Sequence, residues 1–347
     1  MSSTDTSPPL ATIFVLSAAA LAYEVLLVRL FSIIHWHHFA FMVISIALLG
    51  YGASGSLITV FQRGLLKRYN SVLLVNALMF GFSAVICFIA VQRLPFNALE
   101  ILWDTSQWQR LFMSYLLLTL PFFFVANAIA LTMARYYDRI ALIYGVDLIG
   151  AGSGAVAILL LLQFYTPDNV LRILGVLGIV AALLAVHKLA CLGRMMISPL
   201  LALLAVILLF APSDWFELRL SEYKGLEQVL LITGTDHLQR HSSSISQVDV
   251  VESKDIPLRN APGMSLMSPS GTPEQLAVFR DGDEMSTIDK SDTDSLVYQD
   301  YMSSVLPYHI HESPKQVLIL GSSTGNELLQ ATLHGADPVS YTHLTLP

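Results

Sequence analysis

The sequence predicts an all-α transmembrane bundle of about seven helices, followed by a smaller α/β domain. Of its 347 residues, 54% are apolar and only 13% are charged, about half the charged share of an ordinary soluble protein. Long apolar runs fill residues 1–212, whereas short strand-like runs and polar turns fill the remainder. The charge changes at the same place, from 11 basic and 7 acidic residues before it to 8 basic and 19 acidic residues after it.

Composition also excludes some classes of partner and site. The acidic second half argues against nucleic acid as a partner. Both cysteines, Cys87 and Cys191, lie in apolar runs, so neither a disulfide framework nor a cysteine-based zinc site is expected.

The first region contains seven apolar segments. A membrane-spanning helix needs about 20 such residues, and the sixth segment is short and the easiest to miscount. The beginning of the chain has no basic residue before its first apolar run, so it does not resemble a cleavable signal peptide. The predicted spans are 10–31, 39–61, 72–91, 111–134, 141–164, 170–186 and 196–211.

Small residues gather in the second and fifth segments. The spacings Gly50/Ser54 and Gly150/Gly154 let two helix backbones approach closely. A packing seam is the simpler interpretation, and a glycine-lined substrate path is the alternative.

Three ionisable residues lie inside apolar runs, where they are costly and usually face the bundle interior. Glu24 and Arg29 belong to the first segment and Asp147 to the fifth. Glu24 and Arg29 are five residues apart, about 140° around a helix, and so form a poor pair. Pairing of Asp147 with Arg29 is one option. The group is read either as a structural lock or as a proton or cation path.

Three histidines, His35, His37 and His38, surround Trp36 after the first segment. No carboxylate or cysteine lies nearby to complete a metal site. An interfacial loop with an aromatic anchor is favoured, and no metal is predicted.

The second region starts with strands and turns. Residues 244–253 have the β-branched content of a strand, and residues 276–288 read as a hairpin turning at Asp281-Gly282-Asp283. A loop rich in Pro, Gly and Ser separates them. Residues 291–310 are predicted to form one capped helix.

The most specific signal follows. A buried-type strand at 316–320 runs into a glycine turn and then a helix, which is the arrangement that holds a nucleotide-like cofactor on free backbone N–H groups. A plain strand-to-helix turn is the alternative. The turn comprises Gly321, Ser322, Ser323, Thr324, Gly325 and Asn326.

The order of the segments resembles the spermidine synthase (polyamine aminopropyltransferase) family, in particular its bacterial membrane-embedded branch. The similar stretches are YEVLLVRLFS, SIALLGYGASGS, IYGVDLIGAGSGA, SEYKGLEQVLL, SQVDVVES, FRDGDEMSTI, VYQDYMSSVLPYHI and VLILGSSTGNELLQATLHGA. The resemblance implies a β-hairpin module at 213–310 and the start of a Rossmann-like, methyltransferase-like fold at 311–338.

The resemblance also implies a chemistry and a site. The family moves an aminopropyl group from decarboxylated S-adenosylmethionine to an amine. Gln247 and the glycine turn match residues that contact the donor, or another S-adenosyl ligand. On the substrate side, Asp281 matches the Asp of the hairpin, Tyr298 matches a tyrosine, and Gln299 replaces the family's histidine.

Two further departures bear on activity. Thr324 replaces an aspartate that meets the donor's cationic end in the family, which removes a charge-assisted contact. Residues 339–347 are expected to be a non-native tail, and the family's catalytic Asp is expected beyond them, so the chain as given is expected to be inactive.

The leading hypothesis is a membrane-bound, S-adenosyl-type transferase acting on a polyamine or a related amine, with the lipid bilayer as a partner and homo-oligomerisation left open. A transporter or sensor bundle with a non-catalytic binding domain is the alternative, and a simple membrane anchor is a third. Seven basic residues in alternate loops place those loops and the N-terminus in the cytoplasm, under a plasma (inner) membrane. An odd helix count then puts the soluble domain outside, whereas one miscounted helix would put it in the cytoplasm, so its side is left open.

Overall fold

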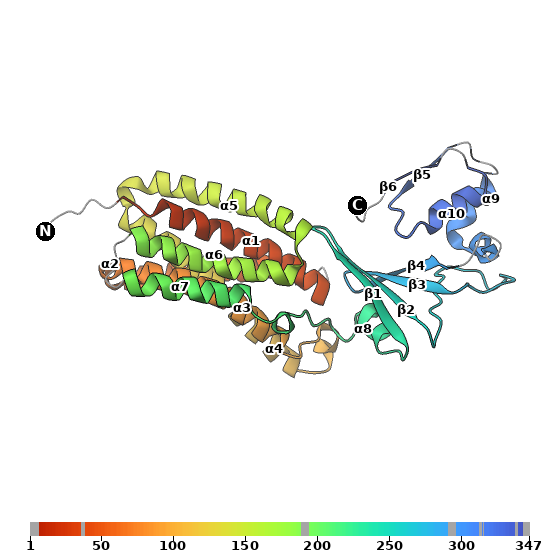
Figure 1. Cartoon of the computed structure of the whole chain (residues 1–347), viewed down its shortest axis with the longest axis horizontal. Coiled ribbons are helices and arrows are strands. Elements are labelled where there is room, and N and C mark those ends of the chain that lie inside the picture. The colour runs from red at the N-terminus through yellow and green to blue at the C-terminus, as the bar shows by residue number, and fades with distance from the viewer. Residues whose placement is uncertain are drawn as a thin grey trace. The chain divides into compact units, whose positions relative to one another are not determined.

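The computed structural model describes residues 7–35, 39–188, 194–290, 296–311, 314, 316–336 and 339–342. The chain divides into two compact units, Met1–Arg219 and Leu220–Pro347. The first unit is helical and the second contains all the described strands (Figure 1).

Seven long helices form the first unit. The segments between the loops are almost wholly apolar. A bilayer offers no partner for backbone N–H and C=O groups, and a helix pairs these groups within itself. The helices are α1 (Leu10–Ile34), α2 (Ala40–Lys67), α3 (Tyr69–Gln92), α4 (Ser106–Arg135), α5 (Ile140–Phe164), α6 (Pro167–Lys188) and α7 (Arg194–Leu209).

Six of these helices are long and apolar enough to cross a membrane. The sixth, predicted as the least secure, is a full helix of 22 residues. The seventh is the short one, with 16 residues and a length of about 24 Å. The expected multi-pass architecture is therefore supported. The helix whose length falls short of a membrane span is α7, and not α6 as predicted.

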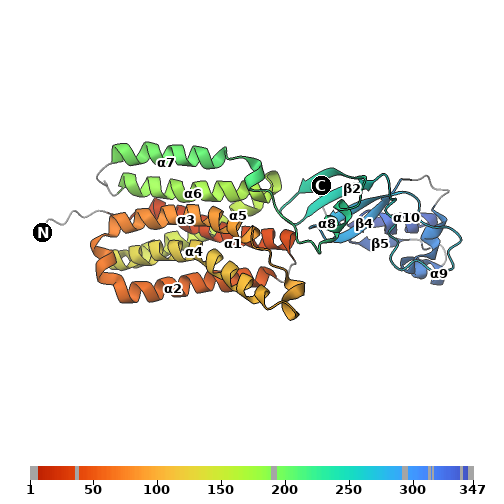
Figure 2. The ribbon, with the colours of Figure 1, turned by 90° about the horizontal axis from the view of Figure 1, so that it is seen from below.

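The centre of the bundle is α1, which packs against α5 and α6 (Figure 2). Beside it, α2 packs on α4, α3 packs on α4 and α6, and α7 packs on α6. Tyr23 of α1 is fully buried, and its hydroxyl donates to the carbonyl of Ala84 in α3 at 3.1 Å.

Glycines set the closest helix contacts. A Cβ added at Gly154 of α5 would lie 2.1 Å from the Ala18 carbonyl oxygen of α1, and one at Gly50 of α2 would lie 2.6 Å from Phe122 Cβ of α4. The predicted packing seams are confirmed at both places. A third seam, Gly81 of α3 against Gly178 of α6, was not predicted.

The second unit begins with α8 (Gly225–Leu230) and an antiparallel sheet in the order β1-β2-β3-β4. The strands are β1 (Thr235–Ser242), β2 (Gln247–Ser253), β3 (Gln275–Arg280) and β4 (Glu284–Asp289). The predicted hairpin is confirmed: Asp281 and Gly282 have φ of 49° and 72°, the backbone that an Asp-Gly turn supplies. Leu226, Val251 and Phe279 are among the few buried apolar residues of this unit.

The predicted helix at 291–310 is wrong where the structure describes it. Two 3₁₀ turns, Val297–Tyr301 and Ser303–Val305, are followed by the short helix α9 (Leu306–Ile310). Met302 between the turns is extended (ψ 146°) and pairs with Met264 in an isolated bridge. That bridge breaks the helical path.

The last elements are β5 (Val317–Leu320), α10 (Asn326–Leu333) and β6 (Val339–Thr342). β6 pairs in parallel with β5, from Val317 beside Val339 to Leu320 beside Thr342. β5, α10 and β6 thus form one strand–helix–strand crossover. Part of the stretch that was predicted to be a non-native tail lies in a strand.

Candidate functional site

The predicted cofactor turn joins β5 to α10. Gly321 and Gly325 have φ of 81° and 89°, so the glycines supply the left-handed backbone that the turn needs. Gly325 is the residue before α10, and the first N–H groups of that helix face its N-terminal end.

Two amides of this turn are already used. The Gly321 N–H donates to Thr342 Oγ1 at 3.2 Å, and the Ser322 N–H donates to the Thr342 carbonyl at 3.1 Å. The part of the turn left to meet a ligand through its backbone is therefore 323–327, which includes Thr324 and the start of α10.

Strand β4 supports this turn. Asn326 Nδ2 donates to the Thr287 carbonyl at 3.3 Å, and the hydroxyls of Ser286 and Ser323 lie 3.2 Å apart. Because both contacts involve neighbouring residues of β4, the glycine turn is fixed over the middle of that strand.

A buried polar network lies at the end of β4. Asp289 accepts hydrogen bonds from Tyr298 Oη at 2.7 Å, Gln275 Nε2 at 2.9 Å and Gln299 Nε2 at 3.2 Å. The Gln299 oxygen accepts from Gln330 Nε2 of α10 at 2.8 Å. Tyr298, Gln299, Gln275 and Gln330 are each at most 3% exposed, so the network is closed everywhere except at the half-buried Asp289.

The Tyr298 hydroxyl keeps its proton in this setting. Burial, and then the hydrogen bond to the Asp289 carboxylate, raise the pKa of Tyr298 above its ordinary value. Tyr298 therefore acts as a hydrogen-bond donor to Asp289 and not as a base.

The structure separates the predicted site residues into two places. Gln247 and Asp281 lie together at the hairpin end of the sheet, where the Gln247 N–H donates to Asp281 Oδ1 at 2.8 Å. From Glu284, beside the hairpin, to Asp289 β4 extends about 17 Å. Gln247 and Asp281 thus lie far from Tyr298 and Gln299, and the glycine turn lies between the two places.

Another buried carboxylate was missed. Asp249 of β2 is fully buried and meets His237 Nε2 at 2.8 Å, Arg240 Nε at 2.7 Å and Gln247 Nε2 at 3.0 Å. The sequence feature that could have identified Asp249 is a single charge in the β-branched run QVDVV, at a position of the strand that faces inward.

Within the bundle, Asp147 meets a serine of α1, and the arginine lies elsewhere. Ser17 Oγ of α1 donates to Asp147 Oδ1 of α5 at 2.5 Å. Ser17 and Glu24 are seven residues apart and share a face of α1, and both Glu24 and Asp147 are within electrostatic range of the Tyr51 hydroxyl in α2.

The proposed partner of Asp147 was wrong. Arg29 is twelve residues beyond Ser17, about 18 Å along α1, which is too far for Arg29 to reach the carboxylate that Ser17 holds. Arg29 is buried, and its Nη1 donates to Ser32 Oγ at 3.0 Å.

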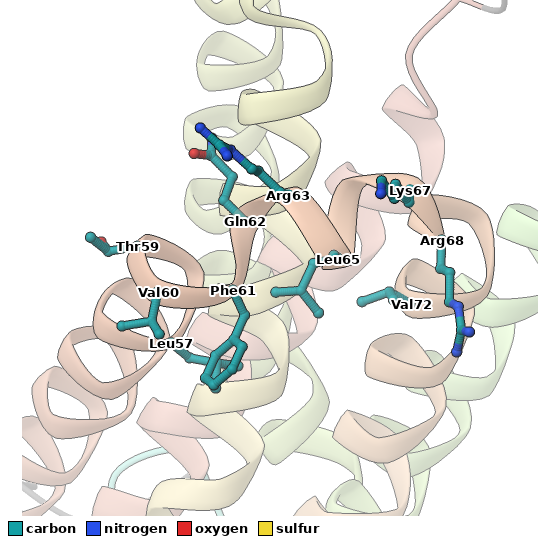
Figure 3. A pocket seen from close by; sticks show the side chains of 11 residues that line it. Leu57, Thr59, Val60, Phe61, Gln62, Arg63, Leu65, Lys67, Arg68 and Val72 are labelled. Carbon is teal, nitrogen blue, oxygen red and sulfur yellow. The ribbon is translucent and has the colours of Figure 1, made fainter.

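The ends of the bundle can be told apart. Tyr69 and Tyr136 rings stand 5.8 Å apart at one end, and the start of α1 lies near Arg139 and His187 at a hollow of about 510 Å³. The start of α1 and the predicted basic loops after α2 and α4 therefore share one end. At that end Arg63, Lys67 and Arg68 border an open hollow of about 1040 Å³, and none has an ion-pair partner among the described residues (Figure 3).

The chain leaves the bundle at the other end. Arg172, near the start of α6, donates to the Ala211 carbonyl after α7 at 3.1 Å, and the Arg219 N–H donates to Gln92 Oε1 at the end of α3 at 2.9 Å. α7 therefore runs back along α6, and the chain emerges opposite the basic loops.

The His35 ring packs on Phe31, Phe39 and Phe96 with centroids 5.3 to 5.9 Å apart, and the interfacial-loop interpretation of its segment stays a prediction. Trp36, His37 and His38 lie outside the described residues. Elsewhere, Asp300, His309 and His334 form a group of possible metal ligands.

Comparison with known proteins adds no assignment: no protein-family model matches the chain, and neither a curated protein nor a solved structure matches it.

Proposed function

We propose that this chain belongs to a membrane-embedded, spermidine-synthase-like protein whose soluble unit binds an S-adenosyl ligand and an amine along β4. The observation that carries the proposal is the docking of the glycine turn on Ser286 and Thr287, about 7 to 10 Å along the strand from Asp289. The start of α10 is thus near a carboxylate, and this arrangement supports the proposal.

Asp289 is suited to an ammonium group. An ionised carboxylate offers about four lone-pair positions, and the described contacts of Asp289 use three of them. The remaining position can accept a charge-assisted hydrogen bond from a protonated amine. Gln299, in the place of the family's histidine, orients Tyr298 and Asp289 without adding a charge.

The cofactor half is tested by S-adenosylmethionine and S-adenosylhomocysteine titrations of the full chain in nanodiscs. Gly325→Ala strains a residue with φ of +89° at the turn, whereas Gly335→Ala strains one with φ of +75° at the far end of the same helix. We expect the first to weaken binding at least tenfold and the second to leave it unchanged. Equal affinities in the two variants would refute the cofactor site.

The amine half is tested by putrescine and spermidine titrations. Asp289→Asn keeps the shape but removes the charge, and should weaken binding by about 10- to 100-fold if the contact is charge-assisted. The control is Asp236→Asn, which alters an exposed ion pair with Lys254. Unchanged amine affinity in Asp289→Asn would move the substrate site elsewhere.

A second function, a proton- or cation-coupled transporter or a sensor, is favoured by the Ser17–Asp147 contact beside Glu24 and Tyr51. The exit of the chain opposite the basic loops also supports it, because the positive-inside rule then places the soluble unit outside the cytoplasm, where S-adenosyl compounds are not made. Polyamine uptake into proteoliposomes that is lost in Asp147→Asn and retained in Gly325→Ala would select this function.

The orientation can be measured with single cysteines in a background lacking Cys87 and Cys191. We propose that the start of α3, which carries the exposed Ser71, is cytoplasmic, so Ser71→Cys in intact cells should resist a membrane-impermeant thiol reagent. Leu266→Cys, fully exposed in the soluble unit, should react. The reverse pattern would invert the proposed topology.

A further inference from the structure

Three possible metal ligands converge at one point of the second unit. Asp300 belongs to the 3₁₀ turn Val297–Tyr301, His309 to α9 and His334 to the end of α10. The Nε2 atoms of His309 and His334 lie 3.1 Å and 3.0 Å from the same atom, Asp300 Oδ1. All three ligand atoms are within 4.8 Å of one another.

We infer that these residues form a site for a divalent transition metal of the zinc type. Zinc binds imidazole nitrogen and carboxylate oxygen at 2.0–2.2 Å in tetrahedral geometry, so neighbouring ligand atoms lie about 3.3 Å apart. The two nitrogen–oxygen separations already match this spacing. An ion needs only a small opening of the group, in which the nitrogens move from the carboxylate to the metal.

The surroundings orient the ligands. The Tyr308 ring stacks on His334 with centroids 5.2 Å apart and planes 9° apart, which holds the plane of that imidazole. The side chains of Asp300 and His309 are about half exposed. A bound ion therefore keeps a position open to water, so the site resembles the open three-ligand class of zinc site more than the closed four-ligand class.

The donor set also selects the metal. Two imidazoles and one carboxylate suit zinc, cobalt and iron, whereas calcium and magnesium prefer oxygen ligands alone. The bound ion would connect the turn that carries Tyr298 and Gln299 to the far end of α10. This inference is independent of the proposed function, since the site needs neither an S-adenosyl ligand nor an amine.

The test uses the full chain, purified without a histidine tag and stripped with a chelator. Zinc is titrated by calorimetry, and cobalt is titrated by its visible absorption, which is intense for a tetrahedral site. We expect one zinc site with micromolar or tighter affinity. Asp300→Asn, His309→Ala and His334→Ala should each weaken it at least tenfold and abolish the tetrahedral cobalt spectrum.

His241→Ala and His311→Ala are the matched controls, because both remove an exposed histidine of the same unit outside the cluster. Both should retain the site. His309→Gln supplies a milder second variant, and its circular dichroism spectrum and melting temperature without metal should equal those of the wild type. The inference is overturned if stripped wild-type protein binds no zinc at 100 µM, or if the controls lose as much affinity as the three ligand variants.

Discussion

The two units of this protein bury their interiors in different ways. The bundle is assembled through backbone-to-backbone approach at glycines, with Gly154 against Ala18 and Gly178 against Gly81. The second unit has a small apolar cluster around Phe279, and two of its carboxylates, on the buried Asp249 and the half-buried Asp289, are bonded to other side chains.

The difference follows from the solvent that each unit is suited to. In lipid, apolar side chains gain little from leaving their surroundings, so close packing at small residues holds helices together. In water, a short unit gains from apolar burial but has little of it, and satisfied polar networks then specify how the elements meet. The comparison predicts that the bundle is most sensitive to added volume and the second unit to lost hydrogen bonds.

The largest effect is expected for Gly154→Leu. Its Cβ alone would lie 2.1 Å from the Ala18 carbonyl oxygen, so α1 and α5 must separate, at a cost of about 3 kcal/mol or more. Gly152→Leu is the control, because nothing lies within 4 Å of a Cβ there. Reactivity of buried Cys87 with a thiol dye on heating reports the loss of packing. Equal melting temperatures for the two variants would show that the α1–α5 contact is not tight.

The second effect concerns Asp249→Ala in the second unit. Removal of a fully buried carboxylate that meets His237 and Arg240 should cost about 3 kcal/mol, the low end for a broken buried pair because both partners are partly exposed. The control, Asp236→Ala, breaks an exposed pair and should cost about 0.5 kcal/mol or less. Hydrogen exchange of the β2 amides measures the loss of stability in both variants. Similar protection in the two variants would contradict the importance of the buried network.

The membrane half was largely predictable because its signals are local. Runs of about 20 apolar residues gave the helices, and the paired small residues Gly150 and Gly154 gave one seam. The seam between Gly81 and Gly178 was missed because it joins single glycines on different helices, which leave no spacing pattern in either. The partner of Asp147 was missed for a similar reason, since a serine in an apolar helix carries no mark of its role.

In the second unit, the turns could be predicted because their residue types are read from neighbouring positions in the sequence. Asp281-Gly282 fixed the hairpin, and Gly321 and Gly325 fixed the strand-to-helix turn. The network around Asp289 depends on a strand, a 3₁₀ turn and α10 meeting in space, and the group at Asp300 and His334 depends on the contact of the same 3₁₀ turn with α9 and the end of α10. No spacing of residues along the chain predicts the Asp289 network or the Asp300 group.

A smaller effect is expected for Tyr298→Phe. The lost hydroxyl leaves Asp289 and Gln299 each without one partner, which should cost about 1 kcal/mol because the half-buried Asp289 can still meet water. Hydrogen exchange of α10 amides is the measurement. Tyr301→Phe is the control, since no hydrogen bond of the Tyr301 hydroxyl is present among the described residues.

The same variant should show a pH dependence. The pKa of Tyr298 is raised in the folded state, so its stabilising contribution is complete below the ordinary tyrosine value of 10 and is lost as the pH rises beyond it. The stability gap between the wild type and Tyr298→Phe should therefore be constant from pH 6 to pH 9 and narrow above pH 10. A gap that widens above pH 10 would mean that the hydroxyl is bound as an anion.

The smallest effect is expected in the loop before α4, at an end of the bundle. It tests whether polar contacts, as in the second unit, also stabilise this loop of the first unit. Asp104 accepts hydrogen bonds from the Ser106 N–H at 2.9 Å and the Ser106 hydroxyl at 2.7 Å, and these bonds lower the pKa of Asp104. Because the carboxylate is favoured in the folded state, its stabilisation is present above the ordinary pKa of 3.8 and is lost as the pH falls through the lower folded value. Asp104→Asn should therefore melt slightly below the wild type at pH 7, and the two curves should converge below about pH 4. Solvent screening keeps the difference small. A difference in melting temperature that stays constant down to pH 3 would show that the Asp104 side chain acts through its shape and not its charge. This exposed loop would then be stabilised by packing, as the bundle is.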